Sequence, residues 1–294
     1  MPRTWKIGLV VGTLPAVAAA MAMLGLGPPP IASGVQLPDL VALASGRFQY
    51  RPGGDFTRDG KPATAPIVAA ITQPLEMMRH QVTVGEYSRC VDAGACRRGD
   101  GTSAADVPMV KISWWDAAAY AAWLSRSTGM AFRLPSDEEW VYAAGSRFGD
   151  AEGAPELDSR DPGRRALDRY ERETAIRTRS DPEPQPVGHF GANEHGLLDI
   201  AGNVWEWTDS CFARGIIDAR GEPSTVTVDC GVRVVEGRHR TYLTDFIRDA
   251  RAGGCTAGLP PSNLGFRLVL DEDWRLRLRG LADRVRRALT GRSI

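Results

Sequence analysis

The sequence predicts a globular chain in which short amphipathic helices and short strands are joined by long loops. Three segments carry a hydroxyl residue followed three positions later by an acidic residue, which is typical of a capped helix N-terminus. Apolar residues follow each of them at helical spacing. Residues 47–50, 233–235 and 266–270 have the composition of strands. The three capping pairs are Thr83 with Glu86, Ser113 with Asp116, and Ser136 with Glu139.

The composition is that of an ordinary globular protein. The chain has 294 residues and a mass of 31.9 kDa, with 43% hydrophobic and 24% charged residues. These values exclude wholesale disorder, a fibre and a polytopic membrane protein, and the length allows one large domain or two small ones. The 36 basic and 36 acidic side chains balance, so we expect no nucleic-acid partner.

The N-terminal segment has the pattern of an export signal. Residues 8–27 carry no charge, follow Arg3 and Lys6, and end at a run of three prolines. We therefore interpret residues 1–27 as a signal peptide or a membrane anchor, and residues 28–43 as a linker. In either case the rest of the chain faces an oxidising compartment, which we expect to be the bacterial periplasm.

The cysteines are expected to pair after export. Cys90 and Cys96 lie on either side of a short segment that contains a glycine, so a disulfide between them is a plausible short clasp. Cys211 and Cys230 lie on either side of a segment with two glycines and a proline, which we interpret as a loop closed by a second disulfide. Cys255 is left over, either buried and inert or reactive.

Two further segments flank the expected core of the chain. Residues 145–186 are polar with little periodicity, and we expect them to form a long surface insertion. Residues 271–294 carry apolar side chains on one helical face with arginines around it, which predicts a basic amphipathic helix. This helix either packs on its own domain or contacts a partner or an anionic membrane, and residues 8–27 offer a second membrane contact.

Five motifs in a fixed order support an assignment to a family. Together they resemble the formylglycine-generating enzyme (sulfatase-modifying factor) domain family over about residues 44–270. The resemblance implies a single α+β domain related to C-type lectins, with short helices, little regular sheet, long loops and a core of buried aromatic residues. The motifs are 82–87 (VTVGEY), 107–117 (VPMVKISWWDA), 133–144 (RLPSDEEWVYAA), 196–208 (GLLDIAGNVWEWT) and 262–267 (SNLGFR).

The resemblance also implies a structural calcium site. In the family, calcium binds at the Gly-Asn-x-Trp-Glu-Trp loop, and the matching ligands would be the carboxylates of Asp199 and Glu206 with the backbone carbonyls of Gly202 and Val204. Oxygen ligands around a turn suit this hard cation. The alternative is that Asp199 caps a turn and Glu206 pairs with an arginine. The family's second calcium site has no matching motif in residues 145–186, so we do not expect it.

The copper chemistry of the family is not expected in this chain. Its oxidase members bind copper through two cysteines near a Gly-Gly-Ser motif, whereas the matching residues 233–251 contain no cysteine. Cys230 precedes this stretch and Cys255 follows it. We therefore expect neither copper nor the formylglycine-generating oxidase activity. The iron-binding branch of the superfamily is excluded as well, because the four histidines lack its spacing and the chain has no room for its helical bundle.

One cluster lies where the family's active groove would be. Arg238, His239 and Tyr242 are candidates for acid–base catalysis or for binding a partner. His189 and His195 flank the expected calcium loop and are interpreted as ordinary loop histidines.

Two functions follow from the resemblance. The first is an exported accessory or maturation factor for a secreted or periplasmic client enzyme, similar to the nitrite reductase accessory protein NirV and the pyoverdine-maturation protein PvdO. The alternative is a divergent metal-dependent oxidase or modifying enzyme that acts on a protein or peptide. Carbohydrate binding rests on the fold alone and ranks last.

Overall fold

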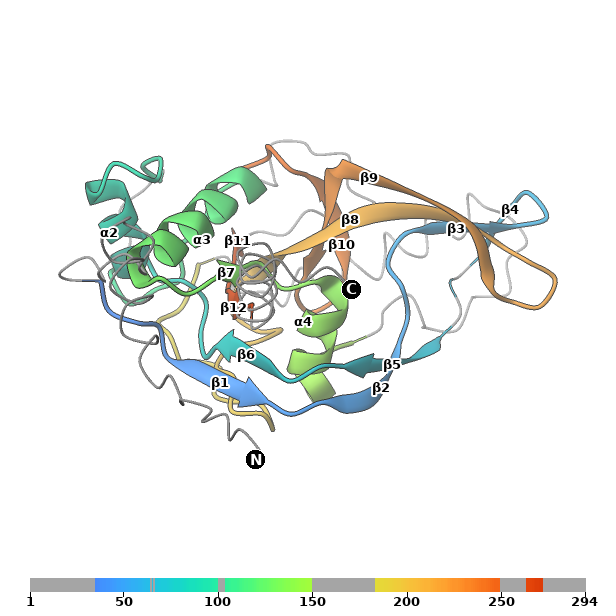
Figure 1. Cartoon of the computed structure of the whole chain (residues 1–294), viewed down its shortest axis with the longest axis horizontal. Helices are drawn as coiled ribbons and strands as arrows, with labels where there is room; N and C mark the ends of the chain where they lie inside the picture. Colours follow the sequence, from blue (N-terminus) through green and yellow to red (C-terminus); the bar gives the residue numbers. More distant parts are fainter. Residues whose placement is uncertain are drawn as a thin grey trace, which may run out of the picture.

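A computed structural model describes residues 35–63, 65, 67–99, 104–149, 183–248 and 263–271. They form one α+β arrangement of three sheets and a few short helices, as expected (Figure 1). The predicted signal segment 1–27, Cys255 and almost all of the C-terminal segment 271–294 lie outside the described residues, as does most of 145–186. Within the described ranges, no helix combines the length and the apolar character needed to cross a membrane.

The described helices begin where the capping pairs predict. They are α2 (Val84–Asp92), α3 (Trp114–Thr128) and α4 (Asp137–Ala144), and the 3₁₀ turn η1 (Gly145–Arg147) follows α4. Each has a complete capping box, in which the hydroxyl accepts from the third helical N–H and the acid accepts from the cap N–H. Each cap contributes about 0.5–2 kcal/mol to helix stability.

A four-stranded sheet joins both ends of the domain. β12 (Val269–Leu270) pairs antiparallel with β6 (Leu75–Met78) on one side and with β7 (Phe132–Arg133) on the other, and β1 (Leu40–Leu43) pairs with the outer edge of β6. The residues just before β12 lie beside an earlier motif, because the Val82 N–H donates to the Phe266 carbonyl at 2.9 Å. A separate hairpin consists of β2 (Gly46–Tyr50) and β5 (Val68–Thr72).

The six-stranded sheet is dominated by a long antiparallel ribbon. We use "the ribbon" for β8 (Trp205–Ile217) and β9 (Pro223–Glu236), whose turn lies at residues 218–222. The ribbon extends away from α2 and α3 in Figure 1. The remaining strands are β10 (Thr241–Thr244) beside β9, β11 (Leu264–Gly265) and β3 (Asp55–Arg58) beside β8, and β4 (Lys61–Ala63) beside β3.

Three expectations about strands need correction. Residues 40–43 are not linker but form β1, because Val41 and Leu43 are buried against the core. The segment between Cys211 and Cys230 is not a loop but most of the ribbon, because Thr and Val alternate along β9. Residues 266–268 are outside a strand, although residues on either side of them pair.

Both predicted disulfides are present. Cys90 pairs with Cys96 at the end of α2, and Cys211 pairs with Cys230 across the ribbon. The second bond ties the two long strands together near the point where the ribbon leaves the body of the domain.

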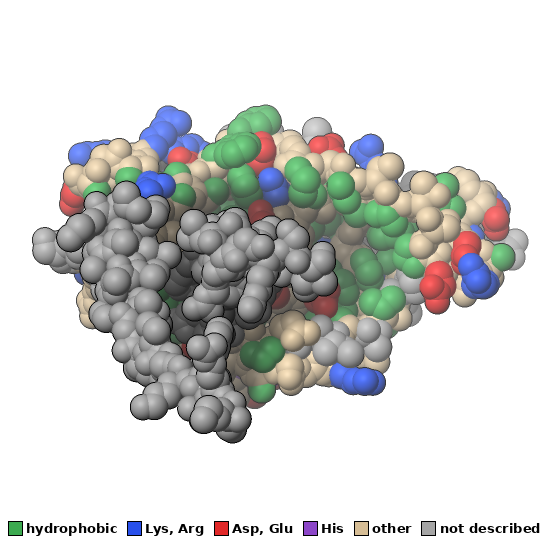
Figure 2. Space-filling model, viewed as in Figure 1, with side chains coloured by type: hydrophobic (Ala, Val, Ile, Leu, Met, Phe, Trp, Pro, Cys, Tyr) green, Lys and Arg blue, Asp and Glu red, His purple; other side chains and the backbone are tan. Residues whose placement is uncertain are grey.

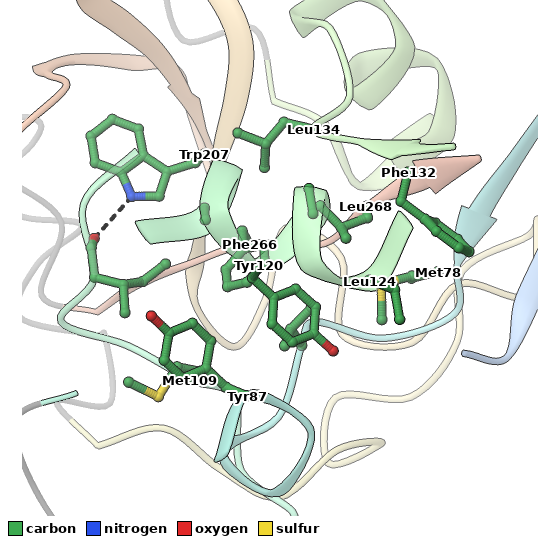
Figure 3. Packing of buried hydrophobic residues seen from close by; sticks show 14 of the residues in the cluster. Met78, Tyr87, Met109, Tyr120, Leu124, Phe132, Leu134, Trp207, Phe266 and Leu268 are labelled. Carbon is green, nitrogen blue, oxygen red and sulfur yellow. Dashed lines mark hydrogen bonds between the residues drawn. The ribbon is translucent and has the colours of Figure 1, made fainter. Parts of the chain in front are cut away.

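Buried aromatic residues form the core under α2 and α3. Tyr87 stacks on Tyr120 with a centroid distance of 5.7 Å, and Phe266 meets both rings edge-on (Figure 3). The Trp207 indole N–H donates to the Ile112 carbonyl at 3.1 Å, so its polar atom is satisfied in the interior. Each such aromatic pair adds about 0.5–1.5 kcal/mol to the area that it buries. The expected core of buried aromatic residues is confirmed.

Candidate functional site

Glu206, one of the predicted calcium ligands, lies on β8 in the interior and pairs with an arginine. Arg267 Nε is 2.6 Å from Glu206 Oε2, and Arg267 Nη2 is 2.8 Å from Oε1. The Gln81 amide donates to Oε1 at 2.7 Å, and the Trp140 indole donates to Oε2 at 2.9 Å. Two oxygens therefore accept four hydrogen bonds, which uses the full capacity of a carboxylate.

Asp199 caps a turn, as in the alternative reading of the sequence. Its carboxylate accepts from the backbone N–H of Gly188 at 2.5 Å and of Phe190 at 2.7 Å. Its φ of 57° places the residue in the left-handed region, and its carbonyl accepts from the Gly202 N–H at 3.0 Å. Asp199 thus fixes the loop that leads into β8.

These contacts do not fit a calcium ion bound through Glu206. Calcium takes about 6–8 oxygen ligands, whereas both Glu206 oxygens face N–H donors, two of which belong to a cation. Across the described residues, no group of three or more His, Cys, Asp or Glu side chains is placed to hold a metal. The resemblance alone supports calcium at Asp199, Gly202, Val204 and Glu206, and such binding would require Glu206 to leave Arg267.

A second buried charge cluster was not predicted. We call Asp137, Glu236 and Arg240 the acid–arginine cluster; all three are buried. Arg240 Nε is 2.7 Å from Glu236 Oε1 and 3.2 Å from Asp137 Oδ1, while Nη2 is 3.1 Å from the same Asp137 oxygen. The Tyr50 hydroxyl donates to Asp137 Oδ2 at 2.5 Å. Strand β2, helix α4 and the end of β9 therefore meet at this cluster.

The surroundings of Glu236 favour its neutral form over its charged form. Burial raises the pKa of Glu236 well above its usual range; Arg240 opposes this, while the neighbouring Asp137 carboxyl group raises the pKa further. Glu236 Oε2 has no hydrogen-bond partner among the described residues.

The predicted groove residues Arg238, His239 and Tyr242 do not converge on one point. Arg238 is exposed, and the His239 ring packs edge-on against Trp205 at 4.5 Å, with Nδ1 3.0 Å from the next carbonyl. Tyr242 is buried, and its hydroxyl accepts from the Gly54 N–H at 2.6 Å. Tyr242 therefore helps to anchor the segment after β2.

The acid–arginine cluster has a weak signal in the sequence. Asp137 follows the Ser136 cap directly and has the pattern of an ordinary first-turn acid. Glu236 and Arg240 are four residues apart and lie on either side of Arg238 and His239, so they belong to the segment that the sequence singled out, although neither was named there. Only the three-dimensional contact with Asp137, about one hundred residues away, distinguishes them.

The stretch that matches the copper segment of the family, residues 233–251, comprises the end of β9, β10 and the residues after them. Its described part contains no cysteine, and both cysteine pairs of the described residues form disulfides. Arg233 of β9 lies over the Trp114 ring at 3.8 Å and 2.8 Å from the Asp209 carbonyl. Polar and aromatic packing thus occupies the side of this strand that faces α3.

Comparisons with known proteins agree with this fold. A formylglycine-generating enzyme of Streptomyces coelicolor is 32% identical over 189 residues, covering 60% of this chain and 56% of that protein. An inactive C-alpha-formylglycine-generating enzyme 2 of Mus musculus is 31% identical over 180 residues, covering 55% of this chain and 48% of that protein. The chain thus spans about half the length of these curated relatives.

A solved structure and a family profile extend the match to most of the chain. PvdO from Pseudomonas aeruginosa has the same fold, with a TM-score of 0.51 and 23% identity over 80% of this chain and 94% of that one. The profile of the sulfatase-modifying factor enzyme 1-like domain matches residues 29–272. The chain therefore belongs to the sulfatase-modifying factor enzyme 1-like (FGE-sulfatase) domain family.

Proposed function

We propose that this chain is an exported accessory or maturation factor, which assists a secreted or periplasmic client enzyme and does not oxidise cysteine through copper. One observation carries the proposal: residues 233–251 contain no cysteine, and Cys211 and Cys230, which precede them, are joined to each other. A disulfide sulfur does not bind Cu(I) as a thiolate does.

The family provides a precedent for a retained fold without the oxidation. A relative from Mus musculus, 31% identical to this chain, is named as an inactive formylglycine-generating enzyme. Two disulfides within one domain support export, because such bonds persist in oxidising compartments. The resemblance to NirV and PvdO suggests the same kind of role, in which the fold recognises a client.

The experiment compares activity with maturation. The purified chain, loaded with Cu(I), is mixed with cysteine-containing peptides while oxygen consumption and peptide mass are followed. We expect neither to change, whereas deletion of the gene should lower the activity of one exported enzyme, and the wild-type gene should restore it. Stoichiometric copper with turnover, or normal exported enzymes after deletion, would contradict the proposal.

The acid–arginine cluster favours a second candidate function, a divergent modifying enzyme. Buried titratable groups with strongly shifted pKa values gather at catalytic sites as well as in structural ion-pair networks. Glu236→Gln keeps the shape of the side chain and removes its titratable carboxyl group. If it abolishes maturation of the client while the fold stays intact, this second function is supported.

A further inference from the structure

The outer edge of β9 is free along most of its length. β10 covers β9 only from Val232 to Val235, and the Gly231 carbonyl accepts from Asp245 N–H at 3.0 Å. From Pro223 to Gly231 every residue is exposed, and no other described strand pairs with this edge. The backbone N–H and C=O groups along it are therefore available to another strand.

This edge lacks the features that normally prevent strand pairing. Between Ser224 and Val228 it contains no charge and no proline, and Thr and Val alternate. Val226 and Val228 are 51% and 68% exposed and, being two residues apart, lie on the same face. Figure 2 shows hydrophobic side chains along the region of the ribbon and charged ones at its tip.

Covalent and backbone contacts hold the ribbon in place, so its free edge is already extended before a partner binds. The disulfide between Cys211 and Cys230 ties its two strands, and β3 pairs in parallel with β8 on the other side. A rigid edge loses little conformational entropy when it pairs.

We propose that the free edge of β9 pairs antiparallel with the same edge of a second copy of this chain. A two-fold axis at Thr227 would set Val226 opposite Val228 of the other copy, and Thr225 opposite Asp229. All four valines then lie together on one face, and no like charges meet. Parallel pairing would instead oppose Asp229 to Asp229, which is destabilising. The two ribbons would form one continuous sheet.

The size of the contact sets the expected strength. A pairing of five or six residues buries much less than the roughly 1,200–2,000 Å² of a stable interface, so the dimer should be weak. We expect the dissociation constant of the dimer to lie in the micromolar range or above. This inference is independent of the proposed accessory role.

Sedimentation velocity of the purified chain from about 5 to about 500 μM tests the pairing. We expect the mass to shift from monomer to dimer with concentration. The double variant Val226→Lys/Val228→Lys should remain monomeric, because the register opposes lysine to lysine. Ile216→Lys is the matched control: Ile216 is 49% exposed on the same ribbon but lies on the inner strand β8, so this variant should dimerise like the wild type.

A second variant tests the register. Thr227→Cys places one thiol from each copy at the axis, so mild oxidation should give a disulfide-linked dimer on a non-reducing gel. Ser88→Cys, exposed on α2, should cross-link far less. A wild-type chain that stays monomeric throughout, or a double-lysine variant that dimerises equally well, overturns the proposal.

Discussion

Arg267 donates two hydrogen bonds to the carboxylate of Glu206, and neither side chain is exposed to solvent. The remaining guanidinium N–H groups donate to the Met78, Arg79 and Leu198 carbonyls at 3.1–3.2 Å. One arginine thus joins β8, the end of β6 and the loop before β8.

Arg267→Met should destabilise the domain strongly. Removing one partner of a buried pair leaves the other charge uncompensated, which costs about 3–5 kcal/mol. Urea unfolding followed by tryptophan fluorescence measures the change. Arg79→Met is the control, because Arg79 and Asp39 form a partly exposed pair that contributes at most about 1 kcal/mol. Equal losses in the two variants would show that burial of the Glu206 pair does not matter.

Glu236 should make the domain less stable as the pH rises. Its pKa is raised in the folded state, so its stabilising contribution is complete below the unfolded pKa of about 4.3 and is lost as the pH rises through the folded value. Between about pH 5 and about pH 9, the melting temperature of the wild type should fall more steeply with rising pH than that of Glu236→Gln. Exposed Glu222→Gln should leave the slope unchanged.

Other carboxyl groups act in the opposite direction at low pH. Burial raises the pKa of Glu139, but hydrogen bonds and charge from Arg133, together with Ser136, outweigh it and hold the pKa below its usual range. Its contribution is present above the unfolded pKa and is lost as the pH falls through the folded value. Acid unfolding should therefore persist in Glu236→Gln, and its disappearance would contradict this assignment.

Local chemistry explains which parts of the fold the sequence predicts. The capping boxes predict all three described α-helices, because a hydroxyl and an acid three residues apart satisfy the backbone within one turn. The disulfides are predicted by export and spacing. The ribbon is missed because Gly215 suggests a loop, although it lies within β8 and a Cβ there would be 2.6 Å from the Phe56 ring.

The sites are harder to predict because their partners are distant in sequence. Glu206 is identified from a motif, yet its partner in the structure is Arg267, which is 61 residues away in the sequence. Asp137 and Arg240 are 103 residues apart, and no periodicity relates them. Motif spacing therefore predicts where charged side chains lie, while long-range packing decides which charges meet.

Removing the ribbon disulfide should cost more stability than removing the clasp at the end of α2. The chain-entropy relation gives about 3 kcal/mol for Cys211–Cys230, separated by 19 residues, and about 2 kcal/mol for Cys90–Cys96, separated by 6. Urea unfolding of the double variants Cys211→Ala/Cys230→Ala and Cys90→Ala/Cys96→Ala measures the two losses of stability. The reverse order would indicate that burial of Cys90, which is fully buried, outweighs loop closure.

Calcium should not change the stability of the wild-type domain through Glu206. All four hydrogen bonds to its carboxylate come from N–H groups, and a calcium ion would have to displace Arg267 and leave that guanidinium buried and unpaired. Melting temperatures in millimolar calcium and in excess chelator should therefore agree, and Glu206→Gln should show no altered calcium response. Arg267→Lys keeps the positive charge but loses the paired geometry, and it should remain insensitive to calcium as well. A rise in melting temperature with calcium that Glu206→Gln abolishes would instead establish the ligand set Asp199, Gly202, Val204 and Glu206, with Arg267 moved away from the ion.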